Sequence, residues 1–173
     1  LKMLLKLKKL TQAKKATGAG NDPAIASLLV GPRGVGKTAL LSHFADTAEL
    51  SGWVTARVTC VAGMLEDILI RTQRATRHLV DIEPARKIKG AGIAVFISLE
   101  LEDSPRELSN WRSRMDDILD ALAECNTGLL GDIDEVNPSI DEMATLVAAF
   151  RLFLDEGKKV ALIHSRVKSP RPE

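Results

Sequence analysis

The sequence is poor in cysteine and contains no long apolar run. Its two cysteines, Cys60 and Cys125, lie far apart and match no metal-binding spacing, so we expect reduced thiols in a cytoplasmic protein. No apolar stretch approaches the length that crosses a bilayer. Lysines interrupt the leucine-rich N-terminus too often for the apolar region of a signal peptide. Membrane insertion is therefore not expected.

Charge is spread unevenly along the 173 residues. Residues 1–20 contain six lysines and no acid, a charge of +6, and the whole chain carries +1, so the remaining residues carry the difference, −5. Such a basic arm is typical of segments that touch nucleic acid or an acidic partner. A solvated basic helix face explains the same lysines without any partner. Both interpretations stay open from the sequence.

Apolar periodicity predicts strands alternating with helices, which is typical of an α/β fold with three layers and a mostly parallel sheet. The domain prediction is a basic helix and linker at 1–23, a core at 24–165 and a tail at 166–173. Predicted strands span residues 24–30, 53–60, 92–101, 127–136 and 158–165, and predicted helices span 1–16, 38–50, 63–80, 105–124 and 139–156. The strand at 24–30 is continuously apolar, so we expect it to be buried on both faces. Ser139 and Glu142 have the spacing of a capping box.

A glycine-rich loop separates the first predicted core strand from the following helix. It matches the pattern G-x-x-x-x-G-K-[ST], and its residues are Gly31, Pro32, Arg33, Gly34, Val35, Gly36, Lys37 and Thr38, with Ala39 next in the helix. Backbone amides that wrap a phosphate must turn inward, and glycine permits that geometry. Lys37 can reach the β- and γ-phosphates, and the Thr38 hydroxyl can bind Mg²⁺. Alternatives are an ordinary βα turn with an incidental lysine and, for Arg33, a solvent-facing side chain.

Two adjacent acids end the predicted strand at 127–136. Asp134 is the candidate Mg²⁺ residue, and Glu135 is the candidate that orients or deprotonates an attacking water. Ligands of open α/β sheets bind at the carboxyl ends of the strands, which favours this interpretation over acids that merely precede a helix. Asp132 lies on the same strand face as Asp134, where an apolar residue is usual. It is either a second metal-site acid or a sign that this part of the sheet is less buried.

The stretches "GPRGVGKTALL", "GLLGDIDEV" and "KKVALIHS" together resemble the AAA-type P-loop ATPases, in particular bacterial and archaeal domains related to origin-recognition proteins, over residues 24–164. The resemblance implies a P-loop NTPase sheet with strand order 5-1-4-3-2, of which strand 5 is missing here. It implies ATP and Mg²⁺ as ligands, with Lys37 and Glu135 in catalysis. It also implies a polar sensor residue at the end of the fourth strand, Ser165 or else His164.

Several parts of that family's pattern are not found in this sequence. The segment that helps to hold adenine is not recognisable before Ala24, and the fifth strand, arginine finger and lid would follow residue 165. The resemblance thus implies a domain cut short before the lid, with strand 26–30 at a sheet edge that another chain, the N-terminal helix or the tail covers.

Three functions are compatible with these residues. The first is Mg²⁺-dependent ATP hydrolysis coupled to conformational change in a larger assembly, with a protein partner or self-association. The second is a switch that binds ATP or ADP and barely turns over, and the third is a DNA-associated ATPase that uses the basic arm. No guanine-reading [NT]-K-x-D or transporter-type LSGGQ motif is present, which disfavours a GTPase and a transporter ATPase. A small-molecule kinase stays possible, although the adjacent acids fit hydrolysis better.

Overall fold

The structure, a computed structural model, describes residues 26–82 and 111–167. Within these ranges strands and helices alternate as the periodicity predicts. The strands are β1 (Ala26–Gly31), β2 (Val54–Thr59), β3 (Leu129–Asp134) and β4 (Val160–Val167), and the helices are α2 (Lys37–Leu50), α3 (Met64–Ile82), α5 (Trp111–Glu124) and α6 (Asp141–Asp155). The predicted helix at 1–16 and the predicted strand at 92–101 lie outside the described residues. None of the described helices is long and apolar enough to cross a membrane.

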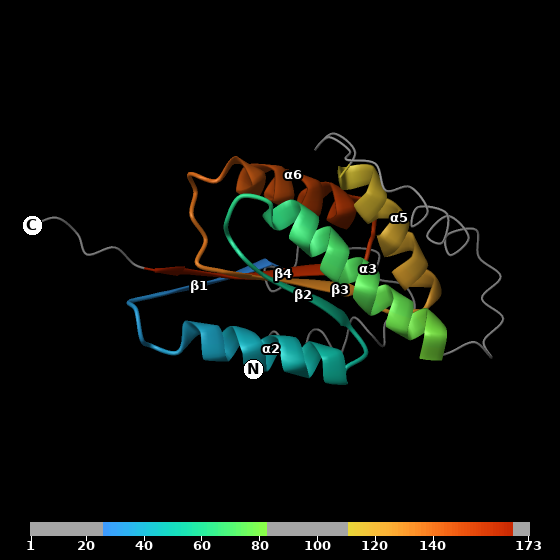
Figure 1. The fold of residues 1–173 in the computed structure, drawn as a ribbon, viewed down its shortest axis with the longest axis horizontal. Helices are drawn as coiled ribbons and strands as arrows, with labels where there is room; N and C mark the ends of the chain where they lie inside the picture. Colours follow the sequence, from blue (N-terminus) through green and yellow to red (C-terminus); the bar gives the residue numbers. More distant parts are fainter. Residues whose placement is uncertain (1–25, 83–110, 168–173) are drawn as a thin grey trace, which may run out of the picture.

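The four described strands form one parallel sheet in the order β1-β4-β3-β2. This confirms the α/β class and the expected order of these four strands. Helix α2 covers one face of the sheet, and α3, α5 and α6 cover the other, which gives three layers (Figure 1). Because all strands run the same way, their carboxyl ends meet at one edge of the sheet. The loops after β1, β2 and β3 therefore begin at that edge.

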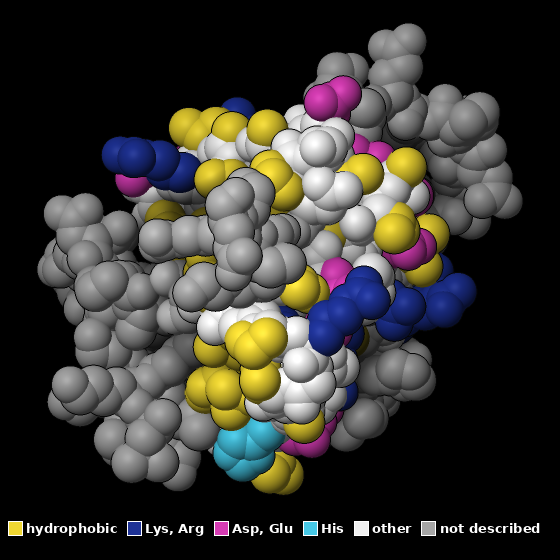
Figure 2. Space-filling model, turned by 90° about the vertical axis from the view of Figure 1, so that its left-hand side faces the viewer, with side chains coloured by type: hydrophobic (Ala, Val, Ile, Leu, Met, Phe, Trp, Pro, Cys, Tyr) yellow, Lys and Arg dark blue, Asp and Glu magenta, His cyan; other side chains and the backbone are white. Residues whose placement is uncertain are grey.

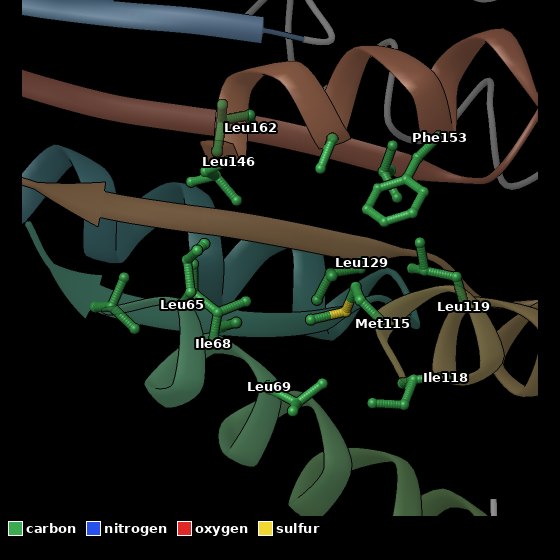
Figure 3. Close-up of a cluster of buried hydrophobic side chains, with 14 of the residues drawn as sticks. Leu65, Ile68, Leu69, Met115, Ile118, Leu119, Leu129, Leu146, Phe153 and Leu162 are labelled. Atoms are coloured by element: carbon green, nitrogen blue, oxygen red, sulfur yellow. The ribbon is translucent and has the colours of Figure 1, made fainter. Parts of the chain in front are cut away.

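The larger core lies between the sheet and the three-helix layer. Helices α3 and α5 each present one apolar stripe, as the 3.6-residue periodicity predicts, and these stripes pack against the sheet (Figure 3). Trp111 is buried here, and its indole Nε1–H donates to the carbonyl oxygen of Leu65 at 2.6 Å, so its polar atom is satisfied. A smaller core lies under α2, where Leu41, Phe44 and Ala48 meet the other face of the sheet.

The prediction that the first strand is buried on both faces is wrong. Leu28 and Val30 are 48% and 56% exposed, because β1 pairs only with β4 among the described strands and so forms an edge. Leu40, which the periodicity placed on the inner face of its helix, is also exposed. The segments expected to cover the β1 edge, residues 1–25 and 168–173, lie outside the described residues, and that expectation stays a prediction.

The predicted capping box at Ser139 is also wrong. Helix α6 begins at Asp141 without a side-chain cap, and Glu142 turns instead to the start of α3. Its carboxylate accepts hydrogen bonds from the backbone amides of Gly63 at 2.7 Å and Leu65 at 2.9 Å. The first amides of a helix have no partner within the helix, and a carboxylate there also complements the helix dipole. Glu142 thus joins the segment after β3 to the segment after β2.

Candidate functional site

The loop between β1 and α2 folds through two left-handed glycines. Gly34 has φ 80° and Gly36 has φ 83°, a backbone conformation that residues with a Cβ rarely adopt. A Cβ built on either glycine would meet nothing within 4 Å, so it is the backbone conformation that favours glycine at both positions. The residues from Pro32 to Gly36 are exposed, which leaves the loop open to a ligand.

The loop leads directly into the N-terminus of α2. Gly36 is the N-cap residue, no side chain among the described residues caps the helix, and its first turn contains no acid. Backbone amides at a helix start carry the positive end of the helix dipole and form an anion-binding site when no side chain satisfies them. An anion can therefore take the place that a capping side chain occupies in other helices.

Lys37 lies along its own loop. Its Nζ donates to the carbonyl oxygens of Gly31 at 3.0 Å and Pro32 at 2.8 Å. Its charge is also one of the causes that lower the pKa of Asp134. The ammonium group is thus held by the loop carbonyls, near enough to the acid at the end of β3 to stabilise its charge.

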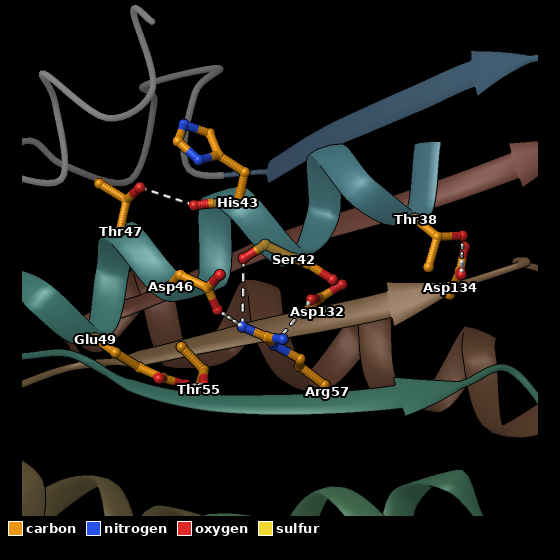
Figure 4. Close-up of polar contacts among 10 residues, drawn as sticks. All are labelled: Thr38, Ser42, His43, Asp46, Thr47, Glu49, Thr55, Arg57, Asp132 and Asp134. Atoms are coloured by element: carbon orange, nitrogen blue, oxygen red, sulfur yellow. Dashed lines mark hydrogen bonds and ion pairs between the residues drawn. The ribbon is translucent and has the colours of Figure 1, made fainter. Parts of the chain in front are cut away.

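The structure brings Thr38 and Asp134 into contact, although they lie 96 residues apart in sequence. The Thr38 hydroxyl donates to Oδ2 of Asp134 at 2.7 Å (Figure 4). Burial raises the pKa of Asp134, but hydrogen bonds from Ser165, Thr38 and the Glu135 amide, with the Lys37 charge, outweigh it and hold the pKa below its usual value. Asp134 is therefore ionised at neutral pH, beside the hydroxyl at the start of α2.

Glu135 adopts a left-handed backbone conformation with φ 54°, which is uncommon for a residue other than glycine. Its amide donates to Oδ1 of Asp134 at 3.0 Å and to Oγ of Ser165 at 3.1 Å, and these bonds hold the strained turn. Glu135 itself is exposed. Backbone strain of this kind costs of order 1–3 kcal/mol and is concentrated at functional sites.

Ser165 is fully buried behind the two acids. Its hydroxyl donates to Oδ1 of Asp134 and accepts from the Glu135 amide, so it fixes the positions of both. Contact between Ser165 and a nucleotide stays a prediction. His164 points to the opposite face of the sheet, and burial lowers its pKa.

Asp132 is buried, 4% exposed, so the suggestion of a less buried sheet region is wrong. Its partner is Arg57, which lies opposite it in the β2–β3 register, with Nε 3.7 Å from Oδ2 of Asp132. The same guanidinium donates to the Ser42 carbonyl at 3.3 Å and pairs with Asp46 (Figure 4). Burial raises the pKa of Asp132 to about 6, while Arg57 lowers it and Asp134 raises it. Arg57 was not among the residues that the sequence predicted for the site.

A cleft of about 180 Å³ opens beside the Thr38–Asp134 pair. It lies between α2 and the ends of β2 and β3, and its lining residues are Thr38, Leu41, Ser42, Arg57, Val58, Thr59, Arg71, Asp132 and Asp134. Figure 2 looks at the carboxyl-end edge of the sheet, where Lys and Arg side chains form a band beside acidic ones. The described residues contain no group of three or more His, Cys, Asp or Glu side chains suited to a metal ion. A cation at Thr38 and Asp134 would thus take its other ligands from water or a bound phosphate, as Mg²⁺ does.

Comparison with protein-family models, with curated proteins and with solved structures found no match for this chain. Neither Cys60 nor Cys125 forms a disulfide.

Proposed function

We propose that this chain binds ATP with Mg²⁺ and hydrolyses it, as an AAA-type ATPase domain that drives conformational change in a larger assembly. The observation that carries the proposal is the 2.7 Å hydrogen bond between Thr38 and Asp134, directly after a glycine-rich loop. The hydroxyl and the carboxylate are the two side chains that hold Mg²⁺ in P-loop NTPases. Their contact joins two motifs that the sequence separates by almost a hundred residues.

The loop and the start of α2 supply the phosphate contacts. Backbone amides around Gly34 and Gly36, with the uncapped end of α2, face the negative charge of the triphosphate. Lys37 exchanges its loop carbonyl partners for phosphate oxygens. Thr38 and Asp134 would hold Mg²⁺, and the bound ion would neutralise charge on the triphosphate. The lowered pKa of Asp134 fits this role, because only the ionised carboxylate is a good ligand.

Glu135 serves the hydrolytic step. The oxygen of a water molecule attacks the γ-phosphorus, and the bond from that phosphorus to the β,γ-bridging oxygen breaks with its electron pair leaving on ADP. The attacking water gives a proton to the Glu135 carboxylate, which later releases it to solvent, and the products are ADP and phosphate. The strained turn, anchored by Asp134 and Ser165, fixes the backbone from which this side chain extends.

Two substitutions separate nucleotide binding from hydrolysis. Lys37→Ala removes the phosphate-binding ammonium, and MgATP binding measured by calorimetry should fall below detection. Glu135→Gln should keep MgATP affinity within about twofold and lower phosphate release by roughly 10²- to 10⁴-fold, the range for loss of a general base. Asp155→Asn is the matched control, because it makes the same kind of change on an exposed residue at the far end of α6. Wild-type phosphate release no faster than that of Glu135→Gln, with binding intact, would favour the nucleotide-gated switch instead.

A further inference from the structure

Two arginines line the cleft beside the Thr38–Asp134 pair, and they differ in their partners. Arg57 is engaged by two carboxylates, Asp46 and Asp132, and by a backbone carbonyl. Its charge is therefore already balanced within the protein. Arg57 supports the wall of the cleft, and its neutralised charge would attract an anionic ligand only weakly.

Arg71 reaches the same cleft from the other side of the sheet. It lies two turns into α3, which packs on the face opposite α2 (Figure 1). Because β2 is an edge strand of the described sheet, a side chain from α3 can pass that edge and meet residues of α2 and β3. Arg71 is exposed, and no acidic side chain pairs with it within residues 26–82 and 111–167.

The charges around the cleft define what Arg71 can bind. Asp134 is engaged by Thr38 and Ser165, and Asp132 faces Arg57, so the acids that line the cleft have other partners. Arg71 is the cation of this lining for which the described part of the chain supplies no acidic partner. A guanidinium presents several N–H donors in a planar fork that matches phosphate oxygens. The cleft has room for several water-sized groups directly beside the candidate Mg²⁺ residues.

We propose that Arg71 binds the terminal phosphate of the nucleotide from within the same chain, so that the site distinguishes ATP from ADP. The inference rests on the proposed function, since it places the terminal phosphate beside Thr38 and Asp134. In hydrolysis the same guanidinium supplies positive charge as the bond between the γ-phosphorus and the bridging oxygen breaks. The water, the proton and the products are those of the proposed reaction.

The test compares Arg71→Ala with Arg71→Lys and with a matched control on the same helix. Arg74→Ala removes the same kind of exposed charge one turn further along α3, and Arg74 does not line the cleft. Calorimetry measures the affinity of each variant for ADP and for a non-hydrolysable ATP analogue, both with Mg²⁺. Phosphate release gives kcat and KM.

Arg71→Ala should weaken binding of the ATP analogue by roughly 10- to 100-fold, as expected for loss of a charged hydrogen bond, and change ADP affinity less than twofold. It should lower kcat by at least 10²-fold, since removal of one donor to developing charge costs that much. Arg71→Lys should recover part of both effects, and Arg74→Ala should match the wild type. If Arg71 served only folding, Arg71→Ala would change the affinities for both nucleotides equally, and Arg71→Lys would not restore them.

The outcomes separate this inference from the proposed function. If the wild type binds and hydrolyses ATP and Arg71→Ala behaves like Arg74→Ala, the Arg71 inference is overturned and the hydrolase proposal stands. If the wild type prefers the ATP analogue through Arg71 but releases no phosphate, the inference stands and hydrolysis fails. Binding of neither nucleotide overturns both.

Discussion

Asp132→Asn should stabilise this protein at neutral and alkaline pH. In the folded state the pKa of Asp132 is raised from 3.8 to about 6, chiefly because the carboxyl is buried. A carboxyl with a raised pKa binds its proton more tightly when folded than when unfolded, so stability falls as the pH rises from about 4 to about 6. A rise in pKa from 3.8 to about 6 corresponds to a cost of about 3 kcal/mol for the charged form. The pKa of about 6 already includes the attraction between Arg57 and the ionised Asp132.

Asparagine keeps the shape of the side chain and carries no charge. The free energy of unfolding of Asp132→Asn should therefore exceed that of the wild type by up to about 3 kcal/mol at pH 8 and should equal it near pH 4. Urea unfolding of both proteins across this range, without nucleotide, measures the difference. Asp46→Asn is the matched control, because it alters the exposed partner of the same Arg57. The Arg57–Asp46 ion pair contributes no more than about 1 kcal/mol to stability. Parallel pH profiles for wild type and Asp132→Asn would refute the reasoning.

Two further predictions concern residues that hold the site together. Glu142→Ala should lower the free energy of unfolding by about 1–2 kcal/mol, because it leaves two amides at the start of α3 without their acceptor. Urea unfolding at pH 7 measures this change. An unchanged urea midpoint would contradict the capping role. Ser165→Ala should raise by roughly tenfold the Mg²⁺ concentration that half-saturates ATP binding, because Asp134 loses the hydrogen bond that orients it. An unchanged Mg²⁺ requirement would show that Ser165 does not support the site.

The order of the four described strands was expected only from the resemblance to AAA-type ATPases. Local sequence patterns were sufficient to predict the strands themselves and the loop at Gly31–Thr38. Each depends on residues near one another in the chain: an apolar run, a glycine spacing, a helical stripe. The proximity of Thr38 and Asp134 also follows from the sequence, because both lie next to carboxyl ends of parallel strands, and those ends share an edge. The identity of the ligand is a separate question, and here it stays a proposal.

The errors arose where a residue's partner depends on the pairing of distant segments. Glu142 has the spacing of a local cap, yet it caps α3 because the segments after β2 and β3 meet in space. Leu28 is as apolar as a central-strand residue, and its exposure follows from the place of β1 in the sheet. Arg57 and Asp132 lie on the same face of neighbouring strands in direct register. Matching opposite charges across predicted strand neighbours would have found that pair.

The most direct test of the account is an ATP titration with and without Mg²⁺ on the wild type, Thr38→Ala and Asp134→Asn. If these two side chains hold the metal beside the triphosphate, Mg²⁺ should tighten ATP binding to the wild type, and either substitution should abolish that gain while leaving the metal-free affinity within about threefold. ATP binding that responds to Mg²⁺ equally in all three proteins, or no binding of ATP to the wild type, would contradict the central claim.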